Sequence, residues 1–120
     1  MVYAYSTFTG LSVKGDYDTG GGCGPYYDSL SGISGAYHTW NYYTQDIACS
    51  ASMTIHISGG SGDTDLYVRK TTNPTLSSYI CRPWLNGNNE TCVISATSGD
   101  YKIGLYAYAA YSGVLLEVSY

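Results

Sequence analysis

The sequence predicts an all-β protein, an antiparallel β-sandwich of two sheets, and three observations lead to this class. Apolar and polar residues alternate with a period of two in several segments, as they do on half-buried strands. Clusters rich in Gly, Asn, Asp and Ser separate these segments at short intervals. No apolar stripe with helical spacing lasts for three turns. Many short strands joined by Gly-rich turns are typical of sandwiches, and 120 residues fit one such domain.

The expected elements follow in chain order. Residues 1–29 form an N-terminal extension with one or two short strands and a Gly-rich loop, docked on a sandwich that spans residues 30–120. Strand character is clear by residues 40–44, and four alternating runs follow, with a turn at Ser112-Gly113 between the last two. The alternating positions in these runs are Met53, Ile55 and Ile57; Leu66 and Val68; Tyr101, Ile103, Leu105 and Ala107; and Val114, Leu116, Val118 and Tyr120.

Composition and charge exclude several classes of protein. The apolar fraction of 44% is ordinary, which excludes disorder caused by a shortage of hydrophobic residues. A net charge of -4 with five Lys and Arg gives no basic surface for nucleic acid or an anionic membrane. No apolar run is long enough to span a bilayer. The first residues lack the basic and apolar regions of a secretory signal, so we expect that signal to be absent or already removed.

The four cysteines indicate an oxidising compartment, and the chain is expected to be secreted. Their spacing contains no short Cys pair of the kind that binds zinc. Four cysteines allow three connectivities. Cys81–Cys92 is favoured because the short segment between them has the character of a hairpin with an Asn-Gly turn, and Cys23–Cys49 follows by elimination.

No catalytic residues are expected. The Gly-x-Ser-x-Gly elbow of a serine hydrolase is missing, and so are phosphate-binding and dinucleotide-binding fingerprints. The chain has two histidines: His56 alternates with core residues and should face solvent, while His38 lies in a stretch rich in Tyr and Trp. Packing or solvation explains both better than catalysis. The sequence therefore indicates a protein that is not an enzyme.

Calcium is the one cofactor that the sequence suggests. Asp16 and Asp18 form one Asp-x-Asp pair in a glycine-rich segment, and Asp63 and Asp65 form a second. Such loops can present several oxygens to a hard cation such as Ca²⁺. The alternatives are a solvated loop for the first pair and a side-chain-stabilised turn for the second.

Two stretches carry a resemblance to a known family. Residues 58–69, which read Ser-Gly-Gly-Ser-Gly-Asp-Thr-Asp-Leu-Tyr-Val-Arg, resemble the signature of bacterial pre-peptidase C-terminal domains, and residues 79–92 resemble a disulfide hairpin of marine-bacterial members. The resemblance covers about residues 30–120 and implies a jelly-roll-like sandwich. It also implies a non-catalytic domain appended to secreted peptidases, related to domains that bind collagen or polysaccharide and in some cases calcium.

Aromatic residues suggest how such a domain would bind a polymer. Fifteen tyrosines exceed what a small core needs, because a buried phenol requires a hydrogen-bond partner. Tyr106 and Tyr108 lie on the strand face opposite Ile103 and Leu105, and Trp84 lies in the disulfide-closed segment. We expect these three rings to bind an extracellular polysaccharide, glycan or collagen-like polymer. The alternative is a structural unit, either a secretion and folding appendage or a subunit that associates with itself through strand pairing.

Overall fold

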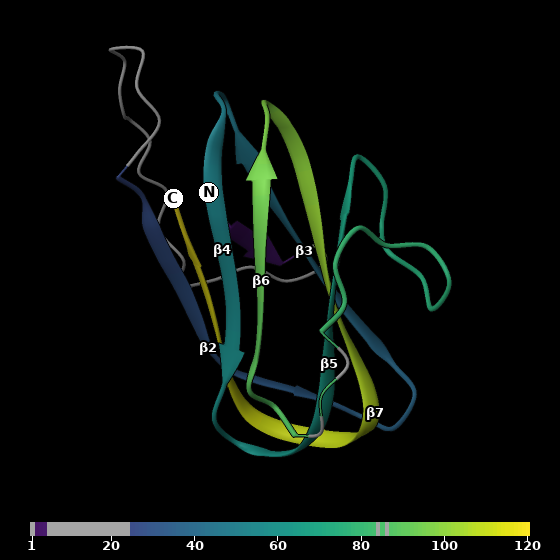
Figure 1. Cartoon of the computed structure of the whole chain (residues 1–120). Helices are drawn as coiled ribbons and strands as arrows, with labels where there is room; N and C mark the ends of the chain where they lie inside the picture. The colour runs from purple at the N-terminus through teal and green to yellow at the C-terminus, as the bar shows by residue number, and fades with distance from the viewer. Residues whose placement is uncertain (1, 5–24, 84, 86) are drawn as a thin grey trace.

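The computed structural model describes residues 2–4, 25–83, 85 and 87–120, and over these residues the protein is all-β (Figure 1). The described residues contain no helix, and hence none that could cross a membrane. The strands are β1 (Val2–Ala4), β2 (Tyr27–Gly35), β3 (Trp40–Ile47), β4 (Ala51–Ser58), β5 (Ser61–Lys70), β6 (Glu90–Ala96) and β7 (Gly99–Ser119).

Every strand pairing among the described residues is antiparallel, and β7 pairs directly with β2, β3, β4 and β5. The sheet order is β1-β3-β7-β4-β6, with β2 and β5 also paired to β7. The first half of β7 lies between β3 and β5, whereas its second half lies between β2 and β4. The antiparallel all-β class is thus confirmed. The two predicted sheets are not separate in the hydrogen bonding, because β7 belongs to both groups of strands.

Strand β7 is 21 residues long and curves under the molecule in Figure 1. The turn predicted at Ser112-Gly113 is wrong, because the strand bends there and continues instead of reversing. Gly113 takes a φ of 74°, and β5 begins directly against this bend. A Cβ on Gly60 or Gly62 would lie 2.0 Å from a β7 carbonyl oxygen, so only glycine permits this approach.

The core contains the alternating apolar residues that the sequence predicted. Met53, Ile55 and Ile57 are fully buried on β4, while the intervening Thr54 and His56 are partly exposed. The same pattern holds for the predicted inward positions of β7, from Tyr101 to Val118. Burying these aliphatic side chains contributes about 1.5–3 kcal/mol each, which explains why the period-2 pattern determines which way each strand faces.

The disulfide Cys81–Cys92 is present, as predicted, and closes a loop that we call the Cys81–Cys92 loop. The strands beside it do not form a hairpin with each other: Cys81 bridges to Val68 of β5, whereas Cys92 pairs with Ile55 of β4. The disulfide therefore links the segment beside β5 to strand β6, which pairs with β4. Cys49 is disulfide-bonded as well, and its predicted partner Cys23 lies outside the described residues.

Candidate functional site: an aromatic face

Aromatic side chains gather on the outward face of the β3-β7-β5 part of the sheet. Strand alternation directs Trp40 and Tyr42 of β3 and Tyr106 of β7 to this face, away from the core. Trp40 lies directly opposite Tyr106 in the strand register, with ring centroids 4.9 Å apart. Residues separated widely in the sequence are thus brought together by strand pairing.

Five rings follow one another across this face, and we call them the aromatic ladder: Tyr37, His38, Tyr106, Trp40 and Tyr42. Their successive centroid distances are 3.5, 5.7, 4.9 and 5.2 Å. Three of the four contacts are stacked within 22° of parallel. Tyr37 is 63% exposed at one end of the ladder, so a ligand could reach its ring without any rearrangement of the core.

A glycine and a tight turn position the ladder. Gly104 of β7 lies beside Trp40, and a Cβ added to it would lie 2.8 Å from the indole ring and 2.9 Å from Pro74. Only a glycine allows the indole to lie this close to the sheet. His38 takes a φ of 61° in the turn before β3, and its backbone N–H donates to the carbonyl of Ala107. That bond holds the turn, and the first two ladder rings, against β7.

Tyr67 of β5 packs beside the ladder on the same face of the sheet and is fully buried. Its ring meets Trp40 and Tyr79 edge-on, at centroid distances of 5.0 and 5.5 Å. The Arg82 guanidinium lies 4.9 Å from the centre of the same ring. Burial raises the pKa of Tyr67 to about 12, which keeps its hydroxyl neutral. Tyr67 is thus a buried ring against which Trp40 and Tyr79 pack.

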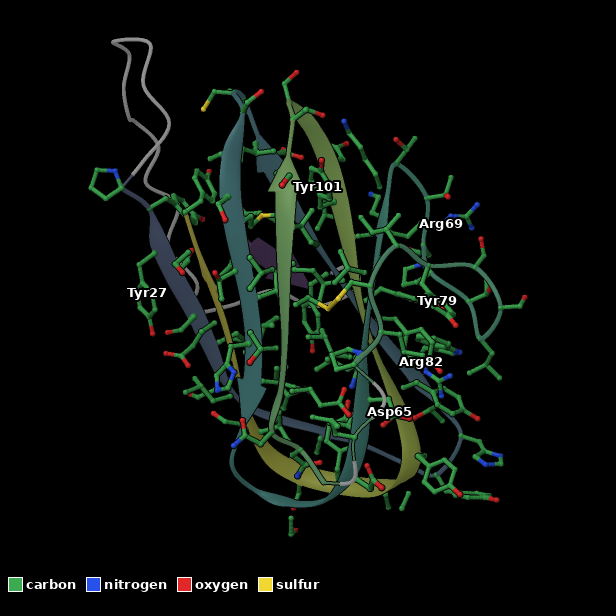
Figure 2. All side chains as sticks on the ribbon, viewed as in Figure 1. Tyr27, Asp65, Arg69, Tyr79, Arg82 and Tyr101 are labelled. Carbon is green, nitrogen blue, oxygen red and sulfur yellow. A yellow bond between two sulfur atoms is a disulfide. The ribbon has the colours of Figure 1, made fainter. Side chains whose placement is uncertain are left out.

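Several charged groups lie on or beside this face, and Arg82 and Asp65 form a pair there (Figure 2). Arg82 lies 3.9 Å from the carboxylate of Asp65, which is almost fully buried. Glu90 is 1% exposed and accepts hydrogen bonds from the backbone N–H groups of Leu66, at 2.7 Å, and Leu85, at 3.0 Å. Desolvation raises the pKa of Glu90 to about 7. Arg82, Asp65 and Glu90 therefore hold the Cys81–Cys92 loop against β5.

The predicted calcium ligands have different surroundings in the structure. Asp65 faces Arg82, as described above, while Asp63 is only partly buried. Among the described residues, no three or more His, Cys, Asp or Glu side chains form a group that could hold a metal. Asp16 and Asp18 lie outside the described residues. Calcium binding stays a prediction for both pairs.

The predicted binding residues are only part of this face. Tyr106 is a half-buried member of the ladder, Tyr108 is 62% exposed two residues farther along β7, and Trp84 lies outside the described residues. Sequence reasoning did not select the other ladder rings. Trp40 and Tyr42 do carry a local signal, since positions two apart share a strand face. Their alignment with Tyr106 depends on a register that the sequence does not show.

Comparison with known proteins identifies the family. A sequence model described as the bacterial pre-peptidase C-terminal domain matches residues 40–107, more than half of the chain. The chain belongs to this family. Pre-peptidase C-terminal domains are non-catalytic C-terminal parts of secreted bacterial proteases, which places the chain outside the cell. Most of the ladder lies within the matched residues, and Tyr37 and His38 precede them.

The relatives of this pre-peptidase C-terminal domain are much longer proteins. Alkaline serine exoprotease A of Vibrio alginolyticus is 45% identical over 92 residues, which are 76% of this chain and 17% of that protein. The virulence metalloprotease of Vibrio anguillarum is 48% identical over 88 residues, which are 72% of this chain and 14% of that protein. The chain thus spans less than a fifth of the length of these relatives.

Two solved structures share the fold. The solution structure of vEP C-ter 100 has a TM-score of 0.64 and 42% identity, and the match covers 73% of this chain and 88% of that one. The pre-peptidase C-terminal domain of a collagenase from Bacillus anthracis has a TM-score of 0.56 and 20% identity, covering 79% and 87%. The second likeness supports the fold alone.

Proposed function

We propose that this domain is a non-catalytic accessory module that binds an extracellular polymer through the aromatic ladder and Tyr108. The observation that carries the proposal is the ladder itself, a continuous row of rings of which three lie on antiparallel strands and two in the turn before β3. Aromatic rings stack on the apolar faces of sugars and on proline rings, and they need no ion pair for this. A row fixed in advance also limits the conformational entropy lost when a polymer binds.

Polysaccharide and collagen-like protein are the two polymer classes that suit such a row. Both repeat a flat or ring-shaped unit along an extended chain, so some units can stack on the exposed rings of Tyr37 and Tyr108 while others meet the edges of the rings between them. The similar fold in a collagenase is compatible with the collagen-like class. The contacts of the two histidines support a binding role over a catalytic one: His38 stacks between Tyr37 and Tyr106, and His56 bonds to the hydroxyl of Thr91 at 2.7 Å.

Co-sedimentation with insoluble collagen, chitin and cellulose tests the proposal. Tyr37 and Tyr108 are the best positions to change, because both side chains are more than 60% exposed and their removal should leave the fold intact. We expect Tyr37→Ala and Tyr108→Ala each to weaken binding by about 1–2 kcal/mol, roughly 5- to 30-fold.

Tyr27 provides a matched control, because it is 61% exposed but lies on β2, far from Tyr79 and Arg82 in Figure 2. Tyr27→Ala should bind the polymer as the unmodified chain does. An equal loss of affinity in all three variants, or no loss in Tyr37→Ala and Tyr108→Ala, would contradict the proposal.

A further inference from the structure

Among the strands of the described residues, four lie at the outer edges of the sheet: β1, β2, β5 and β6. An edge strand presents unpaired backbone N–H and C=O groups, and natural proteins usually shorten, bulge, charge or cover such an edge. Strand β1 is only three residues long. Strand β2 has two register shifts against β7 and a positive φ at Gly32. These two edges are thus protected by length and by irregularity.

The edge of β5 is covered by the Cys81–Cys92 loop. Three alternate N–H groups along this edge, those of Thr64, Leu66 and Val68, donate to acceptors in or at the start of the loop. These acceptors are the side chains of Asn88 and Glu90, at 2.8 and 2.7 Å, and the carbonyl of Cys81, at 3.0 Å. The loop therefore occupies β5 where an added strand would otherwise bind.

Strand β6 is neither short nor irregular in the part of the chain that the structure describes. The Cys81–Cys92 loop contacts it at its first residues, through the Leu85–Glu90 hydrogen bond and the disulfide at Cys92. It pairs with β4 over seven consecutive residues, without a register shift. It contains no Lys, Pro or Gly, and its outward residues Thr91, Val93 and Ser95 are exposed, Val93 by 66%. Within the part of the chain that the structure describes, β4 is the only strand paired with β6. Figure 1 shows β6 at the front of the molecule beside β4.

We propose that the β6 edge binds the β6 edge of a second copy of this chain, in antiparallel orientation around a twofold axis at Val93. This arrangement places Val93 opposite Val93 and Thr91 opposite Ser95. β-Branched and hydroxyl pairs of this kind stabilise cross-strand contacts. Residues 91–95 carry no charge, so the two edges meet without like-charge repulsion. A self-complementary patch of this kind is what a twofold dimer requires.

The resulting contact is small. The area that one seven-residue strand pair buries is well below the ~1,200–2,000 Å² of stable interfaces, so the dimer should form only at high protein concentration. The proposal does not depend on which polymer is bound, because β6 lies outside the aromatic ladder.

Sedimentation equilibrium from roughly micromolar to millimolar concentration, without polymer, tests the pairing. We expect the mass to rise from 12.9 kDa toward twice that value as concentration increases. Val93→Lys should keep the chain monomeric, because two ammonium groups would meet across the axis. Leu76→Lys is the control, since Leu76 is 52% exposed but lies outside β6, and this variant should still dimerise. A monomer throughout the range, or a dimer unaffected by Val93→Lys, would overturn the proposal.

A pair of double variants tests the register and the orientation. Antiparallel pairing at Val93 brings position 91 of one copy to position 95 of the other. Thr91→Lys with Ser95→Glu should therefore retain the dimer through two opposite-charge pairs, while Thr91→Lys with Ser95→Lys should abolish it. Equal dimerisation of the two double variants would overturn the proposed register, and thermal melts would confirm that both are folded.

Discussion

Replacing Glu90 with Gln should change how the stability of this domain depends on pH. The Glu90 carboxyl group is almost fully buried, and its two oxygens accept the N–H groups of Leu66 and Leu85. Desolvation raises its pKa despite these two bonds, and the neighbouring Asp65 carboxylate raises it further. The folded protein therefore holds a proton on this group at pH values where the unfolded chain has released it.

The magnitude follows from the difference between the two pKa values. The pKa of Glu90 rises from 4.5 to about 7 on folding, and each unit corresponds to 1.36 kcal/mol, which gives about 3 kcal/mol. Below the lower value both states are protonated, and the full stability is present. As the pH rises through this window, the unfolded chain loses the proton first, so the free energy of unfolding falls. Above the upper value the loss is complete.

Two other carboxyl groups act in the same direction. A hydrogen bond with Asp100, together with burial, raises the pKa of Asp46 to about 6, and burial raises the pKa of Asp65. The unmodified domain should therefore lose stability between mildly acidic and neutral pH, and Glu90→Gln should remove the largest single part of that loss. The amide of Gln has only one oxygen, so one of the N–H groups of Leu66 and Leu85 loses its acceptor, at a cost of about 1–3 kcal/mol that does not depend on pH. The variant should therefore be less stable than the unmodified protein at acidic pH and should lose less stability as the pH rises to neutral.

Urea unfolding between roughly pH 4 and pH 8 measures this directly. Glu117→Gln is a suitable control, because Glu117 lies on the outward side of β7 and bonds to the Tyr27 hydroxyl at 2.7 Å. The control should keep the slope of the unmodified protein. A stability that is flat or rises through the window, or a Glu90→Gln variant with an unchanged slope, would refute the reasoning.

Three further predictions concern the disulfide, the ladder and calcium. Replacing Cys81 and Cys92 with Ser should cost about 3 kcal/mol in a denaturation experiment, since the bridge closes a short loop; full retention of stability would show that the loop is held by its hydrogen bonds alone. Gly104→Ala should lower the free energy of unfolding by about 1–3 kcal/mol and weaken polymer binding, because the added methyl group displaces the ring of Trp40. An unchanged melting temperature in calorimetry together with unchanged co-sedimentation would contradict this. If Asp63 contributes to a calcium site, added Ca²⁺ should raise the melting temperature and EDTA should reverse it, whereas an absence of both shifts would leave Asp63 as a turn residue.

The sequence was a good guide wherever a local pattern determines the outcome. Met53, Ile55 and Ile57 are buried as their alternation predicts, because each inward aliphatic side chain loses its hydration on folding. The Ser112-Gly113 pair predicts a turn, but a Gly with positive φ, such as Gly113, occurs both in turns and in bends within a strand. What distinguishes the two is the approach of β5, which lies about 50 residues earlier in the chain.

The aromatic face could be predicted only in part, for a related reason. Alternation predicts that Tyr106 lies on the face opposite Ile103 and Leu105, and in the structure its side chain is half-buried on that face. Its contact with Trp40 depends on the β3-β7 register, which is set by the whole strand pair and not by either segment. Tyr67 also lies on the outward face, but it is buried there by Arg82 and Tyr79, which belong to a different part of the chain. Alternation indicates a face, and only tertiary structure shows whether that face is covered.

Polymer binding by Tyr37→Ala tests the central claim most directly, because Tyr37 is an exposed ladder ring whose loss should not disturb the core. Binding isotherms on insoluble collagen, chitin and cellulose would be recorded for the unmodified domain, for this variant and for Tyr27→Ala. The proposal predicts saturable binding to at least one of these polymers, a loss of roughly 5- to 30-fold for Tyr37→Ala and no loss for Tyr27→Ala. Binding that is unchanged in Tyr37→Ala, or no binding of the unmodified domain to any of the three polymers, would contradict it.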